Sequence, residues 1–373
     1  MAMGKVFRFV LVSSIAMLLG GAATALPAAG DADRDRQVFV DAMAPHGAAR
    51  PVVAVLALNE GTEMTDLLLP TAVLRRADVA DVVVVAPRAG EVALYPALRV
   101  RGAISFEDFA RRYPAGASHV VVPAMVDDDD PAVTGWLRQQ AASGARVIGV
   151  CSGVRVVGRA GLLDGRRFSG HWYDRRTLLE RHRGAVHVPD RRYVVDGPVA
   201  TTTGITASVP AMLALVEALG GPARAAALAG ELGVSDWGPS HDSAAFGLDT
   251  PRAFHYLVNK AAFWRGETLQ VDVADGADEV ALALVADAWV RTGHVSLVAV
   301  SDAAAVTLRS GLVLASSPPV AGRSRVPRET ALPPVRQLDR ALCEIGERHG
   351  DARRDWVMQE MEYPMPEGGL CGR

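Results

Sequence analysis

The stretch "RVIGVCSGVR", residues 146–155, places a single cysteine after a short apolar run and before Ser-Gly. The run 147–150 is apolar and partly β-branched, which is typical of a strand buried on both faces of a parallel sheet. A cysteine where such a strand turns sharply into a helix would lie in a nucleophile elbow. Backbone N–H groups and the helix N-terminus favour a thiolate there, so we predict that Cys151 is reactive, with a pKa below that of a free thiol. The alternative is a buried cysteine that acts as a small hydrophobic residue.

Length and composition describe an ordinary globular protein. The chain has 373 residues, of which 50% are hydrophobic and 22% charged, and its formal net charge is −3. This length predicts two domains or one extended domain. Basic residues are dispersed along the chain, so we expect no nucleic-acid partner. We expect a small-molecule substrate or ligand, and we leave a homodimer open.

The N-terminus has the pattern of an export signal. Lys5 and Arg8 precede an apolar run over 9–19, and small residues follow at 23–25. This pattern predicts a secretory signal peptide that is released after residue 25, and therefore a periplasmic or secreted protein. An uncleaved anchor is the alternative, and only in that case do we expect contact with a membrane.

Export changes the interpretation of the three cysteines. Oxidising compartments favour disulfides, and an odd count leaves one thiol free. With Cys151 set aside, we expect Cys343 and Cys371 to form a disulfide in the tail. The competing interpretation is two independent thiols, which a cytoplasmic protein would favour.

Strand-like apolar runs alternate with helix-like patterns along the first half of the chain. The strand-like runs are 51–58, 81–86, 119–123 and 146–150, the clearest helical patterns are 67–74 and 131–143, and we expect a further helix over 250–264. Such alternation predicts an α/β fold with a doubly wound, flavodoxin-like parallel sheet. Ligands of such sheets bind outside the carboxyl ends of the strands, and Cys151 falls at one of these ends.

The C-terminal part of the chain repeats its beginning. Residues 276–293 ("GADEVALALVADAWVRTG") match residues 61–78 ("GTEMTDLLLPTAVLRRAD") at an offset of 215 residues. The strand patterns that follow also match, until the similarity ends near residue 320. We therefore predict a degenerate, partial second copy of the strand–helix–strand opening.

Two runs carry a resemblance to a known family. They are "VIGVCSGVRVVGRAGLLDGRRFSGHW" (147–172) and "YVVDGPVATTTGITASVPAMLALVE" (193–217). They resemble the ThiJ/PfpI superfamily of the class I glutamine-amidotransferase-like fold. The similarity is greatest to the branch that includes isonitrile hydratases and the sensor domains of some AraC-type regulators. The resemblance covers roughly residues 51–220.

The resemblance and the patterns together divide the chain into five segments. They are a signal peptide (1–25), a leader or linker (26–50), a ThiJ/PfpI-like domain (51–266), a degenerate half-repeat (267–320), and a linker with a C-terminal helical tail (321–373).

The resemblance also implies two partners for the cysteine. The family places an acidic residue on the first helix, and the matching residue here is Asp66. A carboxyl beside the thiol can set its protonation, although Asp66 could instead solvate an exposed helix face. The family often has a histidine near the thiol at the position of His171, which would supply a proton shuttle. The half-repeat has Ala281 at the position of Asp66 and no following cysteine, so we expect it to be structural.

Oxyanion and substrate binding would fall to the elbow and to the neighbouring strand end. Our candidates are Ser152, Gly153 and Ala124, although many relatives have glycines where this chain has Pro123-Ala124-Met125. No pair of side chains has metal-ligand spacing, so we expect neither a metal nor another cofactor.

Two functions stay open. The first is a cysteine-dependent enzyme that hydrates or hydrolyses a small electrophilic substrate, as isonitrile hydratases do. The second is a non-catalytic module that senses a ligand or an oxidant, like the AraC-type sensor domains but without a DNA-binding domain. The fold cannot separate them, because one scaffold carries many activities.

Overall fold

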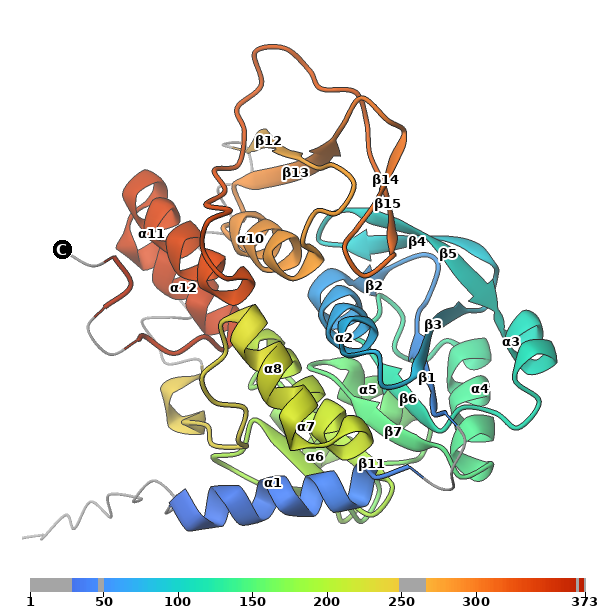
Figure 1. Ribbon diagram of the computed structural model, residues 1–373. Coiled ribbons are helices and arrows are strands. Elements are labelled where there is room, and N and C mark those ends of the chain that lie inside the picture. Colours follow the sequence, from blue (N-terminus) through green and yellow to red (C-terminus); the bar gives the residue numbers. More distant parts are fainter. Residues whose placement is uncertain (1–28, 46–49, 248–265, 367–368, 372–373) are drawn as a thin grey trace, which may run out of the picture.

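The computed structural model describes residues 29–45, 50–247, 266–366 and 369–371 (Figure 1). The predicted signal peptide (1–25) and the helix predicted over 250–264 lie outside these residues. Among the described helices, none combines the length and the apolar character that crossing a membrane requires.

A mixed sheet, eleven-stranded within the described residues, forms the centre of the molecule, in the order β10-β11-β7-β6-β1-β3-β5-β15-β14, with β4 beside β5 and β2 beside β4. Its parallel centre consists of β1 (Val52–Leu56), β3 (Asp81–Ala86), β5 (Arg99–Ser105), β6 (His119–Val122), β7 (Arg146–Gly149) and β11 (Val199–Thr202). The remaining strands are β2 (Thr62–Glu63), β4 (Gly90–Tyr95), β10 (Tyr193–Asp196), β14 (Ala305–Thr307) and β15 (Val313–Ala315). The predicted parallel α/β sheet is confirmed for the centre, whereas β4, β10, β14 and β15 pair in antiparallel fashion.

Helices cover both faces of this sheet, which explains why its central strands are continuous apolar runs. One face carries α2 (Met64–Ala77), α7 (Ser208–Gly220) and α8 (Pro222–Leu232), and the other carries α3 (Phe106–Arg112), α4 (Pro131–Ala142) and α5 (Gly153–Arg159). Smaller elements are α6 (Arg175–Arg181), β8 (Arg167–Phe168), β9 (Val186–His187) and the 3₁₀ turns η1 (Ile205–Ala207), η2 (Ser243–Ala245) and η4 (Pro334–Arg336).

The segment expected to be a leader contains a helix that belongs to the fold. Helix α1 (Ala29–Met43) packs against α7. Phe39 and Met43 are buried, and the ring of Phe39 lies 4.9 Å from that of Tyr193. The four-residue spacing of these two side chains places them on one face of the helix, which is the face that docks.

The segment after residue 266 follows the element order of the first half. It runs β12 (Glu267–Asp272), α10 (Glu279–Arg291), β13 (Val295–Val300), β14 and β15, in the order of β1, α2, β3, β4 and β5. Strands β12 and β13 form their own parallel pair, whereas β15 joins the main sheet beside β5. Helix α10 packs directly on α2 (Figure 1).

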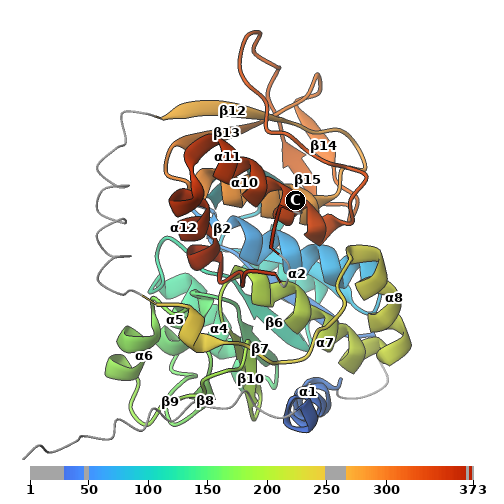
Figure 2. The same ribbon diagram turned by 90° about the vertical axis from the view of Figure 1, so that its left-hand side faces the viewer.

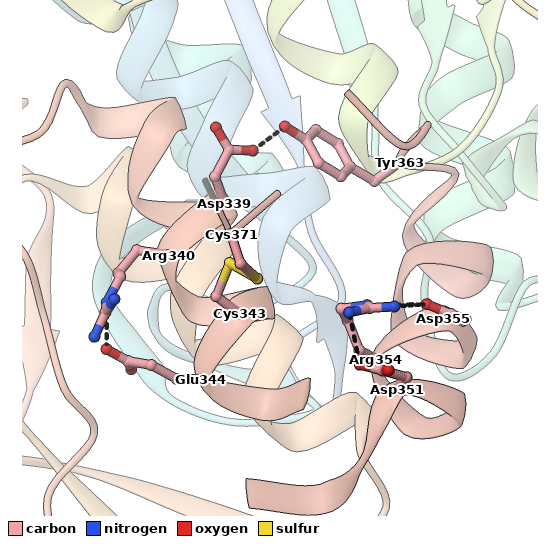
Figure 3. Close-up of a disulfide and its surroundings, with 9 residues drawn as sticks. All are labelled: Asp339, Arg340, Cys343, Glu344, Asp351, Arg354, Asp355, Tyr363 and Cys371. Carbon is pink, nitrogen blue, oxygen red and sulfur yellow. Dashed lines mark hydrogen bonds and ion pairs between the residues drawn. A yellow bond between two sulfur atoms is a disulfide. The ribbon is translucent and has the colours of Figure 1, made fainter. Parts of the chain in front are cut away.

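The tail consists of two helices that cover α10. They are α11 (Gln337–His349) and α12 (Asp351–Met361), and they meet at Gly350, whose φ of +87° suits glycine (Figure 2). Cys343 on α11 and Cys371 form a disulfide with a Cα–Cα distance of 5.5 Å (Figure 3). The Tyr363 hydroxyl donates a hydrogen bond to Asp339, so the final segment is fixed to α11 at two points.

Candidate active site

Cys151 lies in the sharp turn between β7 and α5. Its φ is +53°, in the left-handed region that residues other than glycine seldom adopt, and its N–H donates to Thr202 Oγ1 at the end of β11 (3.1 Å). A Cβ at Gly153 would lie 2.0 Å from the carbonyl oxygen of Val122, so only glycine permits this turn to press against the end of β6. The side chain of Cys151 is 6% exposed.

Asp66 is a fully buried acid in the first turn of α2. Its Oδ2 accepts a hydrogen bond from the N–H of Ala124 (3.1 Å), in the loop that follows β6. Its Oδ1 is buried and has no hydrogen-bond partner among the described residues. Burial raises the pKa of Asp66 well above its usual range, and the neighbouring charge of Glu63 raises it further. Asp66 can therefore hold a proton at pH values at which an exposed aspartate is ionised.

Glu63 is a second buried acid that the sequence analysis missed. It caps α2, accepting hydrogen bonds from the N–H of Asp66 (2.7 Å) and the hydroxyl of Thr65 (2.6 Å). Burial raises the pKa of Glu63 to about 7; Asp287 adds to the increase and Arg291 opposes it. The helix dipole favours acidic residues at the start of a helix, and this weak pattern could have identified Glu63, although glutamate is not a usual N-cap residue.

The positive charge of the site comes from α10. Arg291 donates to Glu63 (3.0 Å), to Asp287 on its own helix (2.6 Å) and to Glu360 on α12 (3.2 Å). Within the described residues, Arg291 is the positive group with the strongest electrostatic effect on Cys151. A residue from the predicted half-repeat thus takes part in the site of the first domain.

The prediction of a lowered thiol pKa is wrong. Burial raises the pKa of Cys151 well above its usual value, and the charges of Asp66 and Glu63 raise it further. Helix α5 behind the cysteine has only seven residues, so its dipole is small beside these effects. Cys151 is therefore a protonated thiol at neutral pH and needs a base to become a nucleophile.

Tyr95, at the end of β4, belongs to the same charge environment. It is half-buried, and burial raises the pKa of its hydroxyl, with further increases from Glu63, Asp66 and Cys151. Tyr95 therefore stays protonated throughout the physiological range and can act only as a neutral hydrogen-bonding group.

His171 lies against the tail. Its Nε2 is 3.0 Å from the carbonyl oxygen of Glu360, and its Nδ1 accepts the N–H of Tyr173. Because a carbonyl oxygen can only accept, Nε2 carries the proton. No hydrogen bond joins His171 to Cys151 in the described part of the chain. His171 thus has hydrogen-bond partners other than the thiol, whereas the charge of Asp66 acts on the thiol directly.

The proposed oxyanion donors are engaged. The N–H of Ala124 donates to Asp66, and that of Gly153 donates to the carbonyl oxygen of Val150 (2.7 Å). Ser152 is half-buried just before α5, and its side chain makes no capping hydrogen bond. A ligand oxygen could use Ala124 only by displacing the carboxyl of Asp66.

The end of the tail contributes a carboxylate beside this site. Glu362 is buried, and its carboxylate accepts the N–H groups of Trp172 (2.8 Å) and Gly204 (2.9 Å). Although burial acts to raise it, the hydrogen bond from His241, the two nearby imidazole rings and the N–H of Gly204 lower the pKa of Glu362 to about 2. Its negative charge also acts on Cys151, so the tail contributes to the electrostatic environment of the thiol.

Comparison with known proteins places the similarity in residues 52–218 and parts of this range. Residues 52–218 match the profile of the DJ-1/PfpI family. The isonitrile hydratase of Pseudomonas putida is 40% identical over 110 residues, which are 29% of this chain and 44% of that protein. The HTH-type transcriptional regulator CdhR of Pseudomonas aeruginosa is 37% identical over 92 residues, which are 25% of this chain and 27% of the regulator. The chain therefore matches less than half the length of either relative.

Solved structures of DJ-1 and THiJ/PfpI proteins also match about half of this chain. Drosophila melanogaster DJ-1beta is 21% identical with a TM-score of 0.45, and the match covers 50% of this chain and all of that one. A THiJ/PfpI family protein from Pseudomonas syringae is 24% identical with a TM-score of 0.44, covering 48% of this chain and 74% of that one. On the family match and the curated relatives, residues 52–218 are a domain of the DJ-1/PfpI family.

Proposed function

We propose that this protein uses Cys151 to hydrate or hydrolyse a small electrophilic molecule, with Asp66 as the proton carrier, in chemistry like that of an isonitrile hydratase. The observation that carries the proposal is the state of Asp66. A fully buried acid with one oxygen lacking a partner, close to an elbow cysteine, is costly for the fold, and such groups cluster at functional sites.

The steps balance for an isonitrile substrate. Asp66 takes the thiol proton as the sulfur of Cys151 bonds to the terminal carbon, and it returns this proton to the same carbon. The resulting thioimidate then adds water, the carbon–sulfur bond breaks, and the sulfur regains a proton. The sum is one substrate plus one water giving one N-substituted formamide, without a net oxidation or reduction.

The raised pKa values suit this sequence of steps. A thiol that keeps its proton until a neighbouring carboxylate takes it is activated only when both groups meet the substrate. The low exposure of Cys151 favours a small, uncharged molecule, because a charged ligand would lose its hydration on entry. Isonitriles meet both conditions.

A non-catalytic sensing module is the second candidate. It is supported by the regulator among the relatives and by the tail, whose Glu362 acts electrostatically on the cysteine. In this function Cys151 would bind a ligand or become oxidised, and no product would be released. Turnover separates the two functions.

The test measures product release from a panel of small isonitriles, aldehydes and amides by NMR. We expect multiple turnovers for at least one isonitrile, which Cys151→Ser and Asp66→Asn abolish or strongly reduce. Glu279→Gln is the matched control, because Glu279 is also a buried acid in the first turn of a helix but belongs to α10. A stable adduct or tight binding without release would reject the enzyme in favour of the sensor.

We also propose that the protein is exported. The N-terminal pattern and the disulfide support this, because disulfides persist mainly in oxidising compartments. Cell fractionation with non-reducing peptide mapping tests it. Recovery of Cys343 and Cys371 as free thiols from a cytoplasmic fraction would overturn the assignment.

A further inference from the structure

Helices α2 and α10 are joined by two ion pairs at opposite ends. Glu63 at the start of α2 pairs with Arg291 at the end of α10 (3.0 Å), and Asp278 at the start of α10 pairs with Arg76 near the end of α2 (2.9 Å). At the repeat offset of 215 residues, Glu63 corresponds to Asp278 and Arg76 to Arg291. Each ion pair is therefore the counterpart of the other, which is what a local two-fold axis between two copies produces.

The strands agree with this relation. β15 pairs with β5 in antiparallel fashion, with Leu314 opposite Val100 and Val313 opposite Arg101. At the same offset, β15 corresponds to residues 98–100, which overlap the start of β5. Two equivalent strands that pair antiparallel are related by a two-fold axis between them, as in an isologous contact between two subunits.

The two ends of this arrangement differ in what lies behind the ion pair. Asp66 and Cys151 lie near Glu63. Near Asp278, the position that corresponds to Asp66 is Ala281, and residues 267–320 contain no cysteine. Arg76 pairs with Glu231 in addition to Asp278, both outside the cysteine site.

We propose that residues 267–315 are a built-in second half of the site, and that Arg291 is its positioning residue, holding the Glu63 carboxylate in place and balancing the negative charge around Cys151. Among the described residues, the ion pairs of Arg291 are with the carboxyl groups of Glu63, Asp287 and Glu360, so it acts on the thiol through them. The chain thereby contains in one polypeptide an arrangement that two copies would otherwise form. The consequence for turnover rests on the proposed function, whereas the effect on the thiol does not.

The charges around Cys151 decide the direction of the effect. Acidic groups approach from two elements: Glu63 and Asp66 from α2, and Glu362 from the tail. Arg291 opposes them and is itself surrounded by Glu63, Asp287 and Glu360, while Tyr95 is neutral and His171 and His241 lie against Glu362. Removing the guanidinium leaves a surplus of negative charge, which disfavours the thiolate.

The test compares Arg291→Gln with Arg76→Gln, since each variant removes one of two equivalent ion pairs. The readout is the pH dependence of Cys151 alkylation by iodoacetamide, followed by intact mass, which needs no substrate. For Arg291→Gln we expect alkylation at pH 8 to slow by about threefold or more, which corresponds to a rise of about half a pKa unit. Arg291→Lys should restore the rate to within about twofold, because it keeps the charge. Arg76→Gln should leave the profile unchanged.

Equal profiles for Arg291→Gln and Arg76→Gln would overturn the proposal. If Arg291→Gln fails to fold, Glu63→Gln and Asp278→Asn ask the same question from the acidic side. Glu63→Gln should then shift alkylation to lower pH, and Asp278→Asn should not; equal responses would again overturn it. Absence of turnover in the parent protein, together with the expected difference in alkylation between Arg291→Gln and Arg76→Gln, would count against the proposed function and not against the role of Arg291.

Discussion

Helices α2 and α10 are packed together, begin with an acidic cap and carry an arginine at or near the end, yet α2 has an aspartate beside Cys151 where α10 has an alanine. Glu63 and Asp278 cap the two helices, and Arg76 and Arg291 join them. What the two regions share is the frame that holds them together. They differ at Asp66, which corresponds to Ala281 in α10 and which the proposed hydration needs as its proton carrier.

Their buried acids show the same contrast. Asp287 on α10 is fully buried but lies 2.6 Å from Arg291, so its charge is compensated. Asp66 on α2 is equally buried, and its closest hydrogen-bond partner is a backbone N–H. A charge buried without a cationic partner costs the fold free energy, and the α2 region retains one beside its thiol.

Of the predicted changes, replacing Asp66 should have the largest effect on turnover, and it tests the difference between α2 and α10. Asp66→Asn keeps the shape of the side chain but cannot carry a proton, so product formation should fall by about 10²–10⁴-fold, the usual contribution of a general acid–base group. Glu279→Gln in α10 should leave turnover within about twofold. Steady-state kinetics on both variants measures this, and equal losses would mean that the two buried acids serve only the fold.

The tail holds the α10 region in place, and its disulfide can be removed. Closing the segment between Cys343 and Cys371 should contribute about 3–4 kcal/mol to the free energy of unfolding in the chain-entropy model, so Cys371→Ser should lose roughly this amount in urea. Because Trp172 and Gly204 still hold Glu362, the pH profile of Cys151 alkylation should not change. A shifted profile would show that the thiol site depends on the disulfide.

The pH dependence of the free energy of unfolding should distinguish Asp66, which has no cationic hydrogen-bond partner among the described residues, from an exposed aspartate. Burial raises the pKa of Asp66 in the folded state, so the folded protein binds this proton more tightly than the unfolded chain. The resulting stabilisation is complete below the unfolded pKa and is lost as the pH rises through the folded value. Between pH 5.5 and 8.5, Asp66→Asn should therefore lose less stability than the parent in urea unfolding. An exposed substitution, Asp302→Asn, serves as control, and identical losses in all three proteins would contradict the account.

Much of the fold could be predicted from the apolar runs, because a strand buried on both faces has few polar residues. The edge strands could not. β15 has only three residues and pairs with β5, which lies far away in the chain, and β4 is partly exposed and has no continuous apolar run. Helix α1 was missed because its overall polarity suggests a leader. Its docking depends on only a few side chains, including Phe39 and Met43.

The candidate site, too, could be predicted from the sequence only in part. Cys151 and Asp66 could be identified from the elbow pattern and the family resemblance, and Glu63 from its place before the helix. Arg291 lies 228 residues from Glu63, and in the sequence only the match between residues 61–78 and 276–293 points to both. The predicted direction of the pKa shift of Cys151 was wrong. The sequence reveals the turn that holds this thiol, but neither how deeply the thiol is buried nor how many acidic groups surround it.

The central claim is that Cys151 and Asp66 exchange protons as one unit in the α2 region. The most direct measurement is the pH profile of Cys151 alkylation by iodoacetamide in the parent protein and in Asp66→Asn. Since the charge of Asp66 raises the pKa of Cys151, the variant should alkylate with a midpoint at lower pH, although it has lost turnover. A midpoint that stays unchanged or moves to higher pH would contradict the account.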